Sequence, residues 1–259
     1  MASDVLCKRL FIANVCMIGE SGGTWTLVDA GLSRTAAEII RTAEERFGKG
    51  CRPQAIILTH GHFDHVGALE TLMRYWDVPV YAHERELPYL TGQSDYLPPD
   101  SSVGGGLMAR MAPLYPYRGI DLGRRVQSLP PDGSLPTLLG WRWVHTPGHT
   151  EGHIALFRDE DRVLIAGDAF TTVKQESAWA VVTQRREVHG PPAYFTSDWE
   201  EAGRSVKKLY GLKPLAVATG HGIPMHGGEL LRQLGRLAVN FDQLAVPDQG
   251  RYVGNEAKR

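Results

Sequence analysis

Residues 58–69 read LTHGHFDHVGAL, and they place four potential metal ligands, His60, His62, Asp64 and His65, within six positions. The apolar run before them predicts a buried strand, and the periodicity after them predicts a helix. Residues two apart in an extended segment point the same way, so His60 and His62 can hold one ion. Asp64 and His65 lie where the chain turns into the helix, from which they can face a neighbouring ion. This stretch therefore predicts a metal centre at a strand-to-helix junction.

Three further potential ligands each follow an apolar, strand-like run. His149 stands in HTPGHTEGH, Asp168 ends RVLIAGD, and His221 lies in AVATGHG. Loops at strand ends are where a rigid scaffold displays functional side chains, so these segments can converge on one edge of the sheets. His145 and His153, which flank His149 in the same motif, are the competing candidates at that position.

Seven ligands exceed what one tetrahedral zinc ion takes, because a catalytic zinc usually has three protein ligands and an open position. Two ions that share a bridging carboxylate account for the surplus. We assign His60, His62 and His149 to the first ion, Asp64, His65 and His221 to the second, and Asp168 to the bridge. Imidazoles and carboxylates suit two Zn²⁺ per chain, and they also suit Mn²⁺ or Fe²⁺. Burying so many ionisable groups without an ion would cost several kcal/mol in lost hydration.

Polar residues outside the ligand set have other expected places. Asp29 and His153 are candidates to hydrogen-bond ligand imidazoles and so to fix their orientation. We expect His83 to line the pocket and His226 to lie on the surface. Neither of these two histidines, nor His189, is expected to bind metal.

Charge and composition exclude several classes of function. The chain of 259 residues has 28 Lys and Arg against 29 Asp and Glu, a formal net charge of -1. The chain therefore lacks the excess of positive charge that is typical of nucleic-acid-binding proteins. No apolar stretch approaches the roughly 20 residues that cross a bilayer, and the N-terminus shows no secretory signal pattern. We therefore expect a cytoplasmic protein that acts on a small molecule, with neither nucleic acid nor membrane as a partner.

The three cysteines support the same expectation. Cys7, Cys16 and Cys51 are odd in number and follow no CxxC spacing. This pattern predicts free thiols in a reducing cytoplasm.

Strand and helix signals alternate along both halves of the chain. Strands are predicted at 10–18, 24–29, 54–59, 78–83, 138–145, 153–158, 162–167 and at the start of 215–222. Helices are predicted at 33–47, 66–76, 197–211 and 228–245, with Ser33 capping the first, Gly48 ending it, and Ser197 with Glu200 forming a capping box on the third. This alternation favours an α/β class in which helices cover mixed sheets.

Two irregular stretches interrupt the pattern. Residues 86–136 are rich in proline and glycine and carry Leu, Met and Tyr side chains, with a short helix expected near 103–112. A long insertion of this kind is usually functional or disordered, and its apolar content predicts a lid. Residues 171–196 form the second stretch. We expect the whole chain, 1–259, to be one domain with the lid and a C-terminal helix at about 228–245 as its additions.

Five motifs together resemble the metallo-β-lactamase superfamily. They are VDAG at 28–31, THGHFDH at 59–65, TPGHTEGH at 146–153, AGDA at 166–169 and GHG at 220–222. The resemblance implies a four-layer αββα sandwich of two mixed β-sheets, with the metal site in a groove at one edge. It also implies that His149 is the ligand within its motif. Some zinc β-lactamases carry a cysteine at the position of Asp168. The aspartate here instead resembles the glyoxalase-II-like and lactonase-like branches.

The resemblance implies a binuclear metallohydrolase that cleaves an ester, lactone or thioester with a metal-bridging hydroxide, because bound cations lower the pKa of water toward neutrality. Asp64 would orient the nucleophile or relay its proton. Only about 35 residues follow GHG, against the larger helical region that grips glutathione in glyoxalase II. Thr171 stands where lactonases often carry a tyrosine.

Other activities on the same fold stay open. They are a mononuclear iron dioxygenase that acts on a persulfide, a β-lactam hydrolase, a phosphodiester hydrolase and a non-catalytic binding domain. A full set of second-site ligands argues against the dioxygenase, and the absence of any lost ligand argues against the binding domain.

Overall fold

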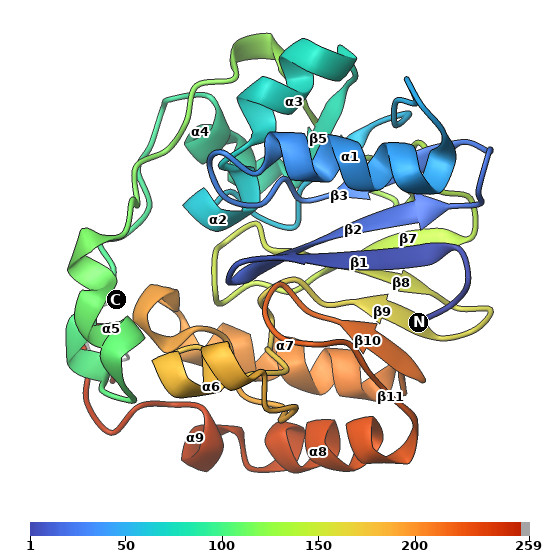
Figure 1. Ribbon diagram of the computed structural model, residues 1–259. Coiled ribbons are helices and arrows are strands. Elements are labelled where there is room, and N and C mark those ends of the chain that lie inside the picture. The colour runs from blue at the N-terminus through green and yellow to red at the C-terminus, as the bar shows by residue number, and fades with distance from the viewer. Residues whose placement is uncertain (255–259) are drawn as a thin grey trace.

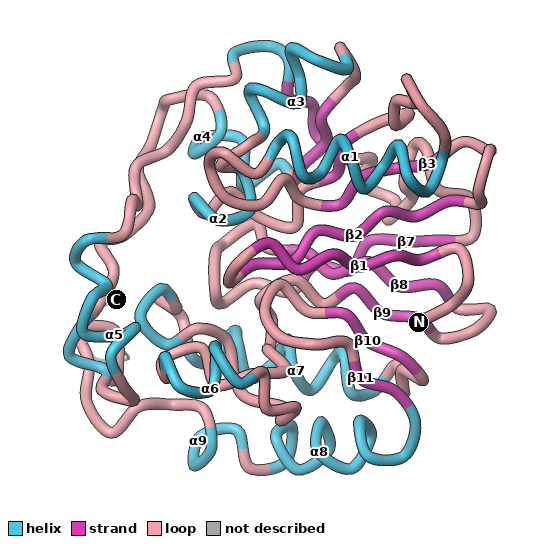
Figure 2. Tube along the Cα trace, viewed as in Figure 1, coloured by secondary structure: helices cyan, strands magenta, loops and turns pink. Residues whose placement is uncertain are grey.

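The computed structural model describes residues 1–254, which form two mixed β-sheets stacked face to face with helices on both outer faces (Figures 1 and 2). The first sheet has the order β1 (Val5–Leu10), β2 (Ala13–Gly19), β3 (Trp25–Val28), β4 (Ile56–Ile57), β5 (Val80–Ala82) and β6 (Val126–Ser128). The second has the order β11 (Met225–His226), β10 (Ala216–Ala218), β9 (Val163–Ile165), β8 (Ile154–Arg158) and β7 (Trp141–His145). The predicted αββα sandwich is therefore the observed architecture.

Both sheets mix parallel and antiparallel pairs. In the first sheet β1, β2 and β3 pair antiparallel, and β3, β4, β5 and β6 pair parallel. In the second sheet only β9 and β10 pair parallel. The carboxyl ends of parallel neighbours lie at one edge of a sheet, which is where α/β folds place their sites.

The helices lie mostly outside the sandwich. They are α1 (Ala36–Phe47), α2 (Phe63–Val66), α3 (Leu69–Trp76), α4 (Leu87–Leu90), α5 (Leu107–Met111), α6 (Ala178–Thr183), α7 (Trp199–Gly211), α8 (Gly227–Val239) and α9 (Phe241–Leu244). Short 3₁₀ turns cover Glu84–Glu86, Ser101–Val103, Ala112–Leu114, Gly123–Arg125 and Ala193–Phe195. Figure 1 shows α1 and α3 over the first sheet and α7 and α8 over the second. Within residues 1–254, no helix has the length and apolar character needed to span a bilayer.

Strand alternation divides the apolar side chains among three core layers. In β2, Val15 and Met17 pack toward α1 and α3, whereas Cys16 and Ile18 pack between the two sheets. In β8, Ala155 and Phe157 face α7 and α8, while their neighbours along the strand fill the space between the sheets. Successive side chains point to opposite faces of a strand, so a strand buried on both faces has an uninterrupted apolar sequence.

The first predicted strand, 10–18, is wrong in its bounds. That range contains the last residue of β1, a turn at Phe11, whose φ of 58° is left-handed, and most of β2, which pairs with β1 as a hairpin. The free-thiol prediction is also wrong for two of the three cysteines. The register places Cys7 directly opposite Cys16, and their sulfur atoms form a disulfide. Cys51 is free.

Two predicted helix starts are wrong by one or two residues. The N-cap of α1 is Thr35 and not Ser33, although Gly48 ends that helix with a φ of 102° as predicted. The N-cap of α7 is Asp198, whose carboxylate accepts a hydrogen bond from the Glu201 amide at 2.9 Å. The predicted helix 228–245 is two helices, α8 and α9, which are separated at Asn240.

The stretch 86–136 is ordered into short elements. It contains α4, α5, which lies within the range 103–112 where a short helix was expected, and the edge strand β6. The sequence did not predict β6. Ala109 and Ala112 of this stretch are buried against Tyr194 and Phe195, which belong to the second irregular stretch. The two stretches therefore pack on each other.

Candidate metal centre

The candidate ligands come from four loops at one edge of the sandwich. The segment between β4 and α2 carries His60 and His62, and α2 itself carries Asp64 and His65. The turn between β7 and β8 carries His149, and loops after β9 and β10 carry Asp168 and His221. All seven side chains are buried.

Three groups of these side chains offer ligand atoms that lie within 4.8 Å of one another. The groups are His60, His62 and His149; His60, His65 and Asp168; and Asp64, His65 and His221. The first and third groups are the two sets of terminal ligands assigned from the sequence. The structure therefore brings together every residue of the predicted ligand set, although these residues lie far apart in the sequence.

Asp168 lies between the two terminal sets. Its carboxylate is 3.0 Å from Nε2 of His221, 3.7 Å from Nε2 of His65 and 3.5 Å from Nε2 of His149. A carboxylate has two oxygens, so it can serve ions on both sides. This position is the one expected for a bridging ligand.

Several ligand atoms have no hydrogen-bond partner within residues 1–254. They are Nε2 of His60, Nε2 of His65 and Oδ1 of Asp168, all of which are buried. Leaving a buried polar atom unpaired costs about 1–3 kcal/mol, so three such atoms facing one another are costly. A divalent cation among them would remove this cost, and the donor set therefore fits a metal centre.

The protonation of three imidazoles suits metal binding. Burial lowers the pKa of His60 and His62 well below 6.5, and the neighbouring histidines lower it further. Burial also lowers the pKa of His149 to about 4. Each ring is therefore neutral near pH 7 and offers a lone pair, the form in which histidine binds a metal.

The remaining imidazoles have pKa values that shift the other way. Burial opposes charge on His65, but the carboxylates of Asp29 and Asp168 outweigh it and raise the pKa well above 6.5. Burial likewise opposes charge on His221, and Asp168 again raises the pKa. The same pairs hold the pKa of Asp168 well below 3.8 despite its burial. The carboxyl group of Asp168 is thus ionised near pH 7, and its negative charge favours the binding of cations.

Asp29 fixes the orientation of His65. Its carboxylate accepts hydrogen bonds from the Thr59 amide at 2.7 Å and the Thr59 hydroxyl at 2.8 Å, and it lies 2.8 Å from Nδ1 of His65. A proton on Nδ1 leaves Nε2 of His65 free to face the cluster. This contact is the one predicted for Asp29.

His153 differs from its prediction. Its Nε2 accepts a hydrogen bond from the amide of Asp168 at 2.8 Å, and its Nδ1 lies 2.8 Å from the Thr146 hydroxyl. It therefore positions the backbone of a candidate ligand and makes no hydrogen bond to an imidazole in the described residues. Its pKa is lowered to about 3, chiefly by burial.

The sequence analysis missed Glu86, which is fully buried beside the cluster. One oxygen accepts from the Gly61 amide at 3.0 Å and the Tyr96 hydroxyl at 2.5 Å. The other accepts from the Thr150 hydroxyl at 2.5 Å and the Gly152 amide at 3.0 Å. Glu86 therefore joins the loop of His60 and His62 to the loop of His149. No local pattern marks it, because Tyr96 is 10 positions away and its other three partners lie 25 to 66 positions away.

The other histidines lie outside the cluster. His83 stacks on His145 with ring centroids 4.3 Å apart and does not contact the ligands. Nε2 of His189 lies 3.5 Å from the carboxylate of Glu187. His226 is exposed, as predicted. The edge of the His83 ring also meets the Trp143 ring, with centroids 5.2 Å apart.

Aromatic rings surround one side of the cluster. The His62 ring lies 4.6 Å from the Tyr96 ring and 4.5 Å from the Phe195 ring, centroid to centroid. Tyr115 lies 5.6 Å from Tyr194. Burial raises the pKa of both phenols, and the Asp64 carboxylate raises it further, so both phenols are neutral near pH 7.

Comparison with known proteins gives three matches of different kinds. Residues 9–221, which include every candidate ligand, match the family model described as the metallo-beta-lactamase superfamily. The chain is 52% identical over 235 residues to the probable metallo-hydrolase YflN of Bacillus subtilis, covering 90% of this chain and 89% of that protein. It is 25% identical over 170 residues to the hydroxyacylglutathione hydrolase GloC of Haemophilus influenzae, covering 65% and 71%.

A solved structure shares the arrangement of the sheets. The crystal structure of TTHA1623 in a di-iron-bound form superposes with a TM-score of 0.56 at 25% identity, covering 90% of this chain and 96% of that chain.

Proposed function

The chain belongs to the metallo-beta-lactamase superfamily and is a metal-dependent hydrolase, and we propose that it cleaves esters, lactones or thioesters at a centre of two divalent cations. The observation that carries the proposal is the arrangement of six buried candidate ligands around a seventh, the carboxylate of Asp168. Three protein ligands suffice for one catalytic zinc, so this set is large enough for two ions.

Each ligand has a proposed place. His60, His62 and His149 would hold the first cation, Asp64, His65 and His221 would hold the second, and Asp168 would be the ligand shared between them. Bound there, the two cations supply Lewis-acid polarisation of a carbonyl and a water molecule of lowered pKa. Zinc suits this donor set, with manganese and iron as alternatives. The di-iron form of TTHA1623 supports testing iron.

Asp64 is the proposed proton-handling residue. Its carboxylate lies 3.5 Å from Nε2 of His221 and faces the phenols of Tyr115 and Tyr194, whose pKa values it raises. A carboxylate at this position can orient the attacking water and accept its proton. Asp29 and His153 keep His65 and the Asp168 backbone in place while charge changes at the centre.

The walls of the site support an acyl substrate. Aromatic rings cover His62, and the segments that pack there carry exposed apolar side chains: Leu107, Met111, Leu114, Trp179 and Val182. Exposed apolar surface of this extent favours a ligand with an apolar group. GloC, a relative, is named a hydroxyacylglutathione hydrolase, which supports thioesters within the proposed class.

A hydrolysis panel tests the proposal. Protein loaded with zinc, manganese or iron is assayed on acyl thioesters, esters, lactones, β-lactams and phosphodiesters, with metal content measured on each sample. We expect the largest kcat/KM on a thioester, ester or lactone with an apolar acyl group.

The control is the His62→Ala variant prepared and loaded in the same way, which is expected to be inactive on every substrate. A preference for phosphodiesters or β-lactams would contradict the proposed substrate class. Oxygen consumption on a persulfide, with one iron per chain, would contradict the hydrolytic reaction.

A further inference from the structure

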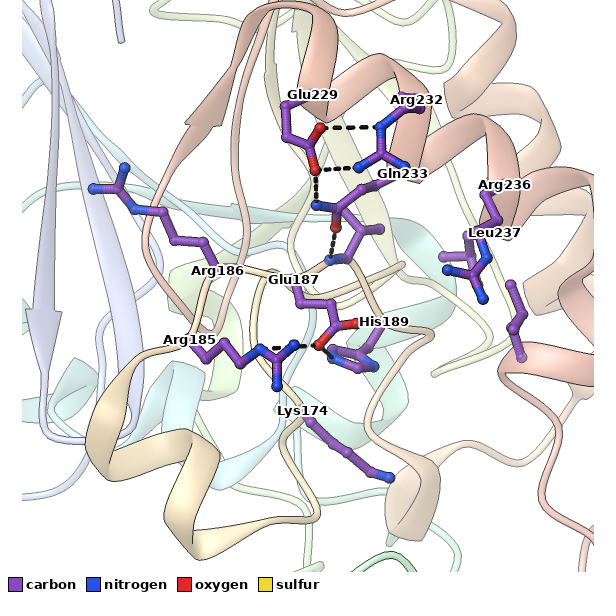
Figure 3. Close-up of a pocket in the computed structure, with 12 residues that line it drawn as sticks. Lys174, Arg185, Arg186, Glu187, His189, Glu229, Arg232, Gln233, Arg236 and Leu237 are labelled. Carbon is purple, nitrogen blue, oxygen red and sulfur yellow. Dashed lines mark hydrogen bonds and ion pairs between the residues drawn. The ribbon is translucent and has the colours of Figure 1, made fainter.

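A cavity of about 450 Å³ lies between α8 and the segment that carries residues 185–189 (Figure 3). None of the seven candidate ligands lines it. Its volume is within the range of small-molecule sites, which run from about 300 to 1,000 Å³. A cavity of this volume is too small for a folded macromolecule, so its ligand is a small molecule.

Two structural segments form its walls. One wall is α8, which presents residues three and four apart on a single face: Glu229, Arg232, Gln233, Arg236 and Leu237. The other wall is the stretch that contains Lys174 and residues 185–189. The Val188 amide donates to Oε1 of Gln233 at 2.8 Å and joins the two walls. Figure 3 shows the side chains of α8 facing the segment that carries Glu187 and His189.

The lining is strongly cationic. Five of its twelve residues are Lys or Arg and two are Glu, although the whole chain has a net charge of -1. Both carboxylates are already paired, Glu187 with Arg185 at 3.7 Å and Glu229 with Arg232 at 2.6 Å. The positive charge of this cavity is therefore a local concentration, and its own acidic residues do not neutralise it.

Two cations on opposite walls have no partner. The side chains of Lys174 and Arg236 make no hydrogen bond or ion pair within residues 1–254. Arg186 is equally unpaired but extends away from the other lining residues in Figure 3. Lys174 and Arg236 thus leave donors available from both sides of the cavity, with Leu237 and Leu244 supplying apolar contact.

We propose that this cavity binds a small molecule that carries a phosphate or pyrophosphate group, held between Lys174 and Arg236. Arginine recognises phosphate through parallel N–H donors, and lysine adds a compact charge. Each contact to an ionised group is stronger than a neutral hydrogen bond, so a doubly charged phosphate gains from both walls at once.

The cavity wall is connected to the candidate metal centre through the backbone. Thr171 and His189 exchange amide hydrogen bonds at 3.1 and 2.9 Å, and the Thr172 amide donates to the carbonyl oxygen of His221 at 3.2 Å. A ligand that binds residues of this wall therefore contacts a segment that is hydrogen-bonded to the backbone of His221. The binding proposal does not depend on this connection or on the proposed reaction.

The experiment measures pyrophosphate binding by calorimetry, using the metal-loaded full chain in 150 mM NaCl. We expect one saturable site on the native protein. Lys174→Gln and Arg236→Gln are each expected to weaken binding about tenfold, because each removes one charge-assisted contact. Both residues are exposed, so the variants are expected to keep the native circular dichroism spectrum and Tm.

The matched control is Arg52→Gln, an exposed arginine that does not line the cavity and is expected to leave the dissociation constant unchanged. His62→Ala separates the cavity from the metal centre, and binding is expected to survive it. Loss of binding in His62→Ala, unchanged affinity in Lys174→Gln and Arg236→Gln, or no saturable binding in 150 mM NaCl would each overturn the proposal.

Discussion

Asp168 is the residue on which the candidate centre depends most, because one carboxylate approaches imidazoles from three different loops. Its nearest approaches are 3.0 Å to His221, 3.5 Å to His149 and 3.7 Å to His65. Removing it leaves those imidazoles without their only shared anion among residues 1–254. Removing a terminal ligand such as His62 affects one proposed ion more than the other.

We therefore predict that Asp168→Ala and His62→Ala each lower kcat by more than about a hundredfold, since loss of a ligand costs more than the 10–100-fold typical of residues that support ligands. Bound metal, measured by elemental analysis, is expected to fall below two ions per chain while the circular dichroism spectrum is retained. His226→Ala, which removes an exposed histidine, is the control. Near-native activity in either ligand variant would refute the assigned roles.

Glu86 provides a test of how the loops are held together. Its two oxygens accept four hydrogen bonds, of which Gly61 and Gly152 supply the backbone donors. A glutamine keeps the shape but replaces one accepting oxygen by an amino group, which faces donors at that position. We predict that Glu86→Gln weakens metal affinity about 10- to 100-fold, as measured by competition with a chelator.

The matched control for this variant is Glu70→Gln, which changes an exposed glutamate of α3 and is expected to leave metal affinity unchanged. An unchanged metal affinity in Glu86→Gln, with the protein folded, would show that the four hydrogen bonds do not position the ligands.

The sequence predicted the candidate ligands better than the groups that support them, for a physical reason. His60, His62, Asp64 and His65 are close in sequence, and a strand end constrains where such neighbours can point. Glu86 has no comparable signal, because its meaning arises only when distant loops meet. His153 was placed near the cluster but given a different partner, since the sequence does not determine which donor an imidazole meets.

At the scale of elements, α7 is the helix that supports the loop of His149. The amides of Ser197 and Asp198 donate to the carbonyl oxygen of Gly148, and the hydroxyl of Ser205 donates to that of Pro147 at 2.7 Å. The start of α7, from the two residues before it to Ser205, is thus part of the metal-site scaffold, and its N-cap matters to both stability and site geometry.

The N-cap assignment gives a direct prediction. Asp198→Ala is expected to lower the free energy of unfolding by about 1 kcal/mol, because it removes the side-chain acceptor of the Glu201 amide. Ser197→Ala serves as the neighbouring control and is expected to change stability by less than about 0.5 kcal/mol. Urea unfolding measures both, and a larger effect at Ser197 would restore the cap predicted from the sequence.

Element boundaries were predicted less well than the elements themselves. The predicted strand 10–18 ran through the turn at Phe11 into β2, because an apolar run does not reveal a turn at an ordinary residue, and β1 was not predicted. The Cys7–Cys16 disulfide follows from the same hairpin, since only the register places the two residues opposite each other. The N-cap of α7 was ambiguous because Ser197 and Asp198 are both good caps.

At the scale of the whole molecule, buried histidines make stability depend on pH. In the folded protein the pKa of His83 is about 4 and that of His153 about 3, both lowered first by burial, whereas an unfolded chain titrates near 6.5. Between these values the unfolded chain binds more protons, so the stability contributed by these histidines falls as pH falls from 6.5 toward 4. His65 and His221, whose pKa values are raised, contribute with the opposite sign.

His83 isolates this effect, because it lies outside the candidate ligand set. We predict that His83→Asn, which keeps an acceptor for the Arg85 amide but cannot titrate, shows a smaller loss of Tm between pH 6.5 and pH 4 than the native chain. Calorimetric scans at matched ionic strength measure the difference. An identical pH dependence in the variant and the native chain would show that His83 takes up no proton on unfolding in this range.

Metal binding at the candidate centre is expected to stabilise the whole sandwich, because candidate ligands from both sheets meet at one edge. His60 and His62 follow β4 of the first sheet, whereas Asp168 and His221 follow β9 and β10 of the second. A cation bound among them would hold the two sheets together in the folded state only, and any ligand that binds only the folded state stabilises it by mass action. Removing the metal is therefore expected to loosen the whole domain edge as well as to stop the reaction.

We predict that exhaustive EDTA treatment lowers Tm by about 5 °C or more, since a few kcal/mol of lost binding energy has this effect in a chain of this size. Differential scanning calorimetry measures the shift, and re-addition of zinc is expected to restore both Tm and activity. Asp168→Ala is the matched control, because a chain that has lost the bridging carboxylate should show a smaller response to EDTA. A metal-free preparation with native Tm and full turnover would mean that the buried cluster is held by its own hydrogen bonds, such as the 2.9 Å contact between His62 and His149, and not by a cation.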